Sequence, residues 1–173
     1  MVIALISDES NIDGAILKEL EKSGTNFTCS LPCNMLAGFL KELDLSVKIR
    51  NIPITREEEG VGICAGAYLG GLKPALIMQN SAIGTTINAL LSLTGLYGLG
   101  LLLLVSYRGT SHEKSIAHVP MGNVSEKILN AAGINYSVIK TRVELKEIRH
   151  YAKESQQGKI NVLLLHPNLW RLK

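Results

Sequence analysis

Short apolar runs alternate with helix-patterned segments along almost the whole of this 173-residue chain. Two of the runs, residues 100–107 and 160–166, are nearly continuous in Leu, Val and Ile, as is typical of strands buried on both faces. This alternation predicts a parallel sheet with helices on both sides. The chain is therefore expected to adopt an α/β fold, a three-layer sandwich around a mainly parallel sheet.

Hydrophobic spacing and Gly or Pro stops give the expected boundaries of each element. Strands are expected at residues 25–31, 47–52, 74–79, 100–107, 136–140 and 160–166. Helices are expected at residues 11–22, 35–43, 56–69, 85–96, 124–132 and 143–156. No linker or repeat interrupts this series, so residues 1–173 are expected to form a single domain.

Composition excludes several classes of function. The net charge is only +3, and no cluster of Lys and Arg is interleaved with aromatic residues, which argues against a nucleic-acid partner. The longest apolar run, residues 99–105, is too short to cross a bilayer, so we expect a cytoplasmic protein without membrane association. Cys29, Cys33 and Cys64 form neither a disulfide framework nor a zinc pattern, and are interpreted as buried small hydrophobic residues.

The segment 55–69 is the most unusual part of the chain. Three adjacent carboxylates, Glu57, Glu58 and Glu59, precede an almost uncharged stretch of Gly, Ala, Cys, Val and Ile. A carboxylate at the mouth of a close-packed helix is poorly solvated and tends to find a hydrogen-bonding partner or a proton. The triplet is therefore a candidate for acid–base chemistry, with a solvated acidic first turn as the alternative.

Ligands of parallel α/β sheets bind at the carboxyl ends of the strands, so the loops after the predicted strands are the expected site. Four motifs in these loops are similar, in the same order, to one family. They are Pro32-Cys33-Asn34, Thr55-Arg56-Glu57-Glu58-Glu59-Gly60-Val61-Gly62, Gln79-Asn80-Ser81-Ala82-Ile83-Gly84 and Ser106-Tyr107-Arg108-Gly109. Together they resemble the pyrimidine-binding domain of thiamine-diphosphate-dependent 2-oxo-acid decarboxylases. The alpha subunits of sulfopyruvate decarboxylases are the nearest branch, with phosphonopyruvate decarboxylases close behind.

The resemblance implies roles for individual residues. The family's glutamate hydrogen-bonds a ring nitrogen of the aminopyrimidine, and counting back from Gly66 assigns this role to Glu57, with Glu58 as the alternative. Pro32, Gln79, Asn80 and Ser81 are expected to face the cofactor. His118 is expected to be catalytic, and Asn34, Arg108 and His112 are expected to bind the substrate.

Some of these residues also have a purely structural interpretation. The planar fork of Arg108 suits a sulfonate or phosphonate, but a surface salt bridge is the competing interpretation. Ser81 is also a reasonable helix N-cap. A loop histidine such as His112 or His118 titrates near neutrality, which suits proton relay, yet loop histidines are more often simply solvated.

A complete enzyme of this family also needs a domain that holds magnesium and the diphosphate, marked by Gly-Asp-Gly and a later Asn. This sequence contains no Gly-Asp dipeptide. The resemblance therefore implies thiamine diphosphate and Mg²⁺ as cofactors, with the metal ligands on a separate beta subunit and none in this chain. Self-association into dimers or higher oligomers is also expected, because the apolar helix 85–96 offers packing surface.

The implied reaction is the decarboxylation of 3-sulfopyruvate to sulfoacetaldehyde and CO₂, a step of coenzyme M biosynthesis in this family. Phosphonopyruvate is the competing substrate, since both are small anionic 2-oxo acids. A non-catalytic, flavodoxin-like binding or scaffold module is the competing class of function, because fold alone does not distinguish it.

Overall fold

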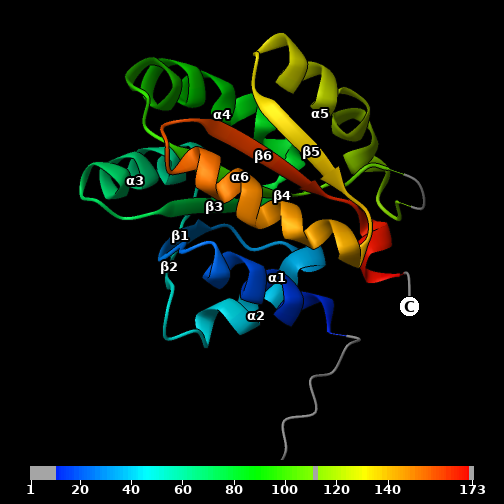
Figure 1. Ribbon diagram of the computed structural model, residues 1–173. Coiled ribbons are helices and arrows are strands. Elements are labelled where there is room, and N and C mark those ends of the chain that lie inside the picture. The colour runs from blue at the N-terminus through cyan, green and yellow to red at the C-terminus, as the bar shows by residue number, and fades with distance from the viewer. Residues whose placement is uncertain (1–10, 111–112, 172–173) are drawn as a thin grey trace, which may run out of the picture.

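The computed structural model describes residues 11–110 and 113–171. Within these residues, six parallel strands form one sheet in the order β2-β1-β3-β4-β6-β5. The strands are β1 Phe27–Ser30, β2 Arg50–Pro53, β3 Pro74–Gln79, β4 Leu101–Ser106, β5 Asn135–Ile139 and β6 Ile160–Leu165. The parallel α/β fold predicted from the alternating pattern is confirmed (Figure 1).

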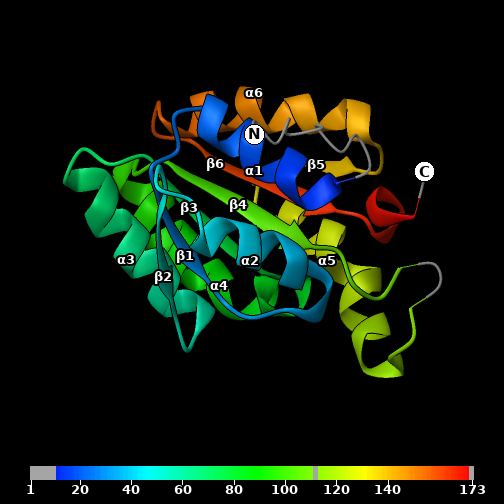
Figure 2. The same cartoon turned by 90° about the horizontal axis from the view of Figure 1, so that it is seen from below.

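Helices cover both faces of this sheet, which gives three layers (Figures 1 and 2). One layer contains α1 Ile12–Lys22, α2 Ala37–Asp44 and α6 Glu147–Ser155. The other contains α3 Glu57–Leu69, α4 Ile83–Ala89 and α5 Val119–Ala131. Successive side chains of a strand point to opposite faces of the sheet, so β4 contributes to both halves of the core. Leu102 and Leu104 pack on the first layer, and Leu101, Leu103 and Val105 pack on the second.

Three helices differ in extent from the prediction. The predicted helix 85–96 consists of α4 followed by a π-helical segment, η3 Leu90–Gly95. The predicted helix 124–132 begins earlier, at Val119, because Pro120 is tolerated in a first turn that needs no amide donor there. The predicted helix 143–156 starts as a 3₁₀ turn, η5 Arg142–Lys146, which a capping box between Thr141 and Glu144 initiates.

The strand order brings together four loops at the carboxyl ends of the parallel strands, a side of the sheet that we call its carboxyl edge. From β1 the chain first adds β2 on one side and then crosses to β3 on the other, so the connections after β1 and β3 diverge at their carboxyl ends. The connection after β4 begins at Tyr107, and the one after β6 begins at His166 and continues as η6 Pro167–Trp170. Residues that are distant in sequence therefore meet at this edge.

Among residues 11–110 and 113–171, no helix has both the length and the hydropathy that crossing a bilayer requires.

Candidate functional site

A polar cluster joins the carboxyl ends of β1, β3 and β4 to the start of α5. The Cys33 thiol lies 3.6 Å from Gln79 Oε1 and 3.2 Å from Ser106 Oγ. The Gln79 amide nitrogen lies 2.9 Å from Ser81 Oγ and 3.2 Å from His118 Nδ1. When Gln79 donates to Nδ1, the imidazole carries its proton on Nε2, so this contact sets both the tautomer and the orientation of His118.

Asn80 is buried and holds the β3 and β4 loops together. Its amide nitrogen donates to the Arg108 carbonyl at 2.9 Å and to Ser125 Oγ at 3.0 Å, and its carbonyl accepts from the Arg108 amide at 3.0 Å. These contacts occupy both ends of the side chain. Asn80 therefore positions the Arg108 backbone against α5, and its role toward a cofactor stays a prediction.

The three adjacent carboxylates have different surroundings at the start of α3. Glu58 pairs with the Arg56 guanidinium, and its pKa lies below the ordinary value because it accepts hydrogen bonds from its own backbone amide and from Arg56. Glu59 accepts from the Thr55 amide at 3.2 Å and the Thr55 hydroxyl at 3.1 Å, and these hydrogen bonds lower its pKa. Glu57 is half-buried and makes no side-chain hydrogen bond or ion pair within the described residues.

Arg108 forms a two-point ion pair with Glu113. Its Nε donates to Oε2 and its Nη2 donates to Oε1, each at 2.8 Å. Glu113 also accepts from the backbone amides of Gly109 and Ser115, each at 3.0 Å. The guanidinium and these amides hold the pKa of Glu113 well below its ordinary value. The salt-bridge interpretation of Arg108 is thus correct in geometry, although the pair is mostly buried, with 17% of the Arg108 side chain exposed.

Glycine at 109 allows the β4 loop to pack directly on the start of α5. Gly109 has φ +78, and a Cβ there would collide with the His118 carbonyl and lie 3.0 Å from Gly122 Cα. Only glycine fits both the backbone conformation and the space. This close approach places His118 beside the strand ends.

A cavity of about 460 Å³ opens next to Arg108 at the same edge of the sheet. Its polar wall includes Asn34, and Trp170 closes one side, held by a 2.8 Å hydrogen bond from its indole nitrogen to Asp13. The complete lining is Asn34, Met35, Arg108, Glu113, Lys114, Pro167, Trp170 and Arg171. Asn34 and Arg108, both predicted to bind the substrate, therefore share one cavity.

The remaining predicted site residues lie apart from this cavity or outside the described chain. Pro32 is exposed and lines a different cavity, between α2 and the strands β1 and β2. Ser81 contacts Gln79 but makes no N-capping hydrogen bond, so the capping interpretation of Ser81 is wrong. His112 lies outside the described residues. Glu57, at the start of α3, makes no hydrogen bond to His118, which contacts Gln79 instead.

Sequence reasoning missed several residues of this edge. Cys33 is free and buried, as predicted for all three cysteines, but its thiol also belongs to the polar cluster. Glu113 and Lys114 follow Arg108 in a loop, where no periodic spacing marks them. Arg171 comes after the last strand, and only the strand order places it beside the β4 loop.

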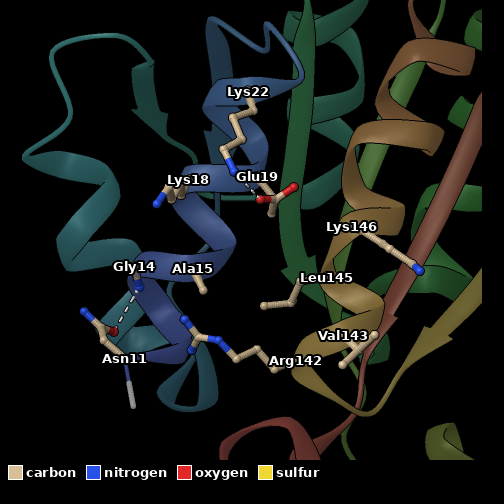
Figure 3. A pocket seen from close by; sticks show the side chains of 10 residues that line it. All are labelled: Asn11, Gly14, Ala15, Lys18, Glu19, Lys22, Arg142, Val143, Leu145 and Lys146. Carbon is tan, nitrogen blue, oxygen red and sulfur yellow. Dashed lines mark hydrogen bonds and ion pairs between the residues drawn. The ribbon is translucent and has the colours of Figure 1, made fainter. Parts of the chain in front are cut away.

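A second large cavity, of about 500 Å³, lies between α1 and η5 (Figure 3). Four cationic side chains line it: Lys18, Lys22, Arg142 and Lys146. They do not converge, because Lys18 and Lys146 extend away from the cavity on opposite sides, and Lys22 pairs with Glu19 at 3.0 Å. Glu19 also pairs with Arg149. This cavity lacks the converging polar groups of a built site.

Within residues 11–110 and 113–171, no three His, Cys, Asp or Glu side chains lie together in a way that could hold a metal ion.

Comparison with known proteins identifies several relatives. The chain is 43% identical over 144 residues to the sulfopyruvate decarboxylase subunit alpha of Methanococcus maripaludis, which covers 83% of this chain and 86% of that protein. It is 45% identical over 138 residues to the same subunit of Methanocaldococcus jannaschii, covering 80% and 82%. A phosphonopyruvate decarboxylase of Streptomyces viridochromogenes is more distant, with 28% identity over 67% of this chain and 30% of that protein. No family model matches the chain.

Among solved structures, the chain is similar to 2-oxoglutarate:ferredoxin oxidoreductase from Magnetococcus marinus, with a TM-score of 0.66 and 11% sequence identity. The match covers 91% of this chain and 29% of that much longer one. Identity this low supports a common fold and nothing more.

Proposed function

This chain belongs to the family of sulfopyruvate decarboxylase alpha subunits, and from that premise we propose that it is one chain of a two-subunit decarboxylase that converts 3-sulfopyruvate into sulfoacetaldehyde and CO₂. The observation that carries the proposal is the gathering of motif residues at the carboxyl edge of the sheet. Gln79 and His118 are in contact there, and Asn34 shares a cavity with Arg108.

Thiamine diphosphate is the cofactor that we propose for this site. When bound, it supplies a thiazolium ring that accepts the electron pair released as CO₂ departs. The residues present fit its aminopyrimidine half, because Glu57 is a half-buried carboxylate whose oxygens have no partner within the described chain. Glu58 and Glu59 are less suitable, since their own hydrogen bonds favour the ionised form.

We assign to Glu57 the role of sharing a proton with a pyrimidine ring nitrogen. A carboxylate is suited to this because it accepts or shares a proton, whereas an ammonium group only donates. The Gln79 contact leaves Nε2 of His118 to donate to the substrate, which is the second proton-handling position that we propose. Asn34 lines the cavity in which we place the substrate.

A beta subunit with the diphosphate and Mg²⁺ ligands is the proposed partner. The absence of any Gly-Asp dipeptide supports this, and so does the designation of the relatives as subunit alpha. On this proposal, residues 1–173 are a single pyrimidine-binding domain. We also propose a cytoplasmic location, because Cys29, Cys33 and Cys64 are free and buried, as suits a reducing compartment.

The outer face of α3 and the neighbouring segment η3 is where we propose that the partner packs. Gly62, Gly66 and Leu69 follow one another at helical spacing on α3, all exposed. A Cβ added at Gly62 or Gly66 would meet no atom within 4 Å. Leu91 on η3 is 42% exposed. Leu96, directly after η3, is 69% exposed. An apolar face bearing open glycines suits close approach by another backbone, from a beta subunit or a second copy.

The proposal is tested by assembling the chain with the beta subunit and measuring aldehyde formation from sulfopyruvate, with thiamine diphosphate and magnesium. We expect turnover by the complex and essentially none by either chain alone. Turnover of phosphonopyruvate in preference to sulfopyruvate would support the competing substrate. No decarboxylation of either compound would favour the non-catalytic binding or scaffold module.

A further inference from the structure

Arg108 was expected to bind the substrate's distal anion, but its two-point donor edge and its charge are already paired with Glu113. The Nε hydrogen and one Nη2 hydrogen donate to Glu113, so the edge of the guanidinium that best matches a two-oxygen anion is occupied. Glu113 is also 6% exposed, so the pair is not readily opened by water. Breaking such a pair exposes an uncompensated charge, which makes exchange of Glu113 for a substrate sulfonate unfavourable.

The pair instead shapes the loop that follows β4. Glu113 accepts from the amides of Gly109 and Ser115 and also pairs with the Arg108 guanidinium, so one carboxylate is bonded to three residues that follow β4. Lys114, which lies between Glu113 and Ser115 in the chain, is exposed and lines the 460 Å³ cavity. Arg108 and Glu113 thereby present Lys114 to the cavity.

Arg171 approaches the same cavity from the end of the neighbouring strand, β6. It follows η6, whose Trp170 is fixed to α1 through Asp13. Within residues 11–110 and 113–171, neither Lys114 nor Arg171 forms an ion pair. Because Glu113 compensates Arg108, Lys114 and Arg171 are the two cavity cations without a counter-ion in the described part of the chain.

We propose that Lys114 and Arg171, and not Arg108, bind the sulfonate of the substrate. These two residues thereby determine the preference of the enzyme for a 2-oxo acid with a second anionic end. This inference rests on the proposed function. An ammonium and a planar guanidinium offer complementary donors to an anion with three acceptor oxygens. Met35, Pro167 and Trp170 form the apolar part of the cavity wall beside these two cations.

The cavity of Figure 3 provides the matched control. It has a similar volume and more cationic side chains, but these diverge, and it does not lie among the loops that follow β1, β4 and β6. Removing the Lys18 charge there changes the net charge of the protein as much as removing that of Lys114. Long-range electrostatic attraction is therefore matched between the two variants.

The test uses the assembled two-subunit complex with its cofactors and three variants: Lys114→Met, Arg171→Met and Lys18→Met. Calorimetry measures the affinity of 3-sulfopropionate, which carries both anionic ends but no keto group. Each of the first two variants is expected to raise its Kd about tenfold or more, whereas Lys18→Met leaves it unchanged. Steady-state kinetics should show a matching rise of KM for sulfopyruvate and little change for pyruvate.

Unchanged binding of 3-sulfopropionate by both cavity variants would overturn the inference, even if the complex decarboxylates sulfopyruvate normally. Equal losses in all three variants would also overturn it, because they would indicate a general charge effect. A complex that binds the probe through these residues but does not turn over sulfopyruvate would contradict the proposed function and leave the anion site standing.

Discussion

Replacing the exposed glycines of α3 by alanine should make the isolated chain more stable and its complex weaker. A glycine within a helix costs about 0.5–1 kcal/mol relative to alanine. A Cβ added at Gly62 or Gly66 would meet no atom within 4 Å, so no steric cost should reduce the gain in folding free energy. The double variant is therefore expected to gain about 1–2 kcal/mol, which corresponds to roughly 2–8 °C in Tm for a chain of this size.

Gly60 on the same helix is the matched control. A Cβ there would lie 2.6 Å from Cδ1 of both Ile54 and Leu76. Overpacking of this kind costs about 1–3 kcal/mol, which outweighs the helix-propensity gain. Gly60→Ala should therefore lower the Tm, in contrast to Gly62→Ala and Gly66→Ala.

Two assays separate stability from association. Circular dichroism of the alpha chain alone gives the Tm, and titration with the beta subunit gives the Kd of the complex. If the partner's backbone approaches this face, the stabilised double variant should bind about tenfold or more weakly, since two methyl groups intrude into the contact. A more stable variant with unchanged affinity would refute the assignment of this face, and a less stable one would refute the geometry of α3.

Two further predictions concern the β4 loop. Glu113→Gln should destabilise the chain by about 2–3 kcal/mol at pH 7, because it leaves the Arg108 guanidinium uncompensated. Since the folded-state pKa of Glu113 is lowered, its contribution is complete above its ordinary value of 4.5 and is lost as the pH falls below it. The difference in unfolding free energy between variant and wild type should thus shrink as the pH falls from about 5 to 3, and a constant difference would contradict this. Gly109→Ala should cost at least about 2 kcal/mol through backbone strain and collision with His118, and an unchanged Tm would show that the loop packs differently.

The sheet was predictable because its sequence signal is direct. A strand such as β4 is covered on both faces, so each of its residues must be apolar, and a continuous run results. The start of α5 was missed because Pro120 and Gly122 look like loop residues. In the structure, proline occupies a first turn, and Gly122 faces Gly109 where no side chain fits.

The site was predictable only to the level of loops. Motif order placed Gln79 and Arg108 at strand ends, and the parallel sheet brings those ends to one edge. The partners of these residues depend on the strand order, which alternation does not encode. The nearness of Arg171 arises from β6 lying beside β4, and the pairing of Arg108 with Glu113 arises within the β4 loop, where no periodic spacing marks it.

The most direct test of the account compares Glu57→Gln with Glu58→Gln in the assembled complex, by the rate of CO₂ release from sulfopyruvate at saturating cofactor. Both changes remove one negative charge from the same helical turn. If Glu57 shares a proton with the cofactor ring, its variant should lose at least about 100-fold in kcat, while the Glu58 variant should stay close to wild type. Full activity of Glu57→Gln, with an intact complex, would contradict the proposed chemistry.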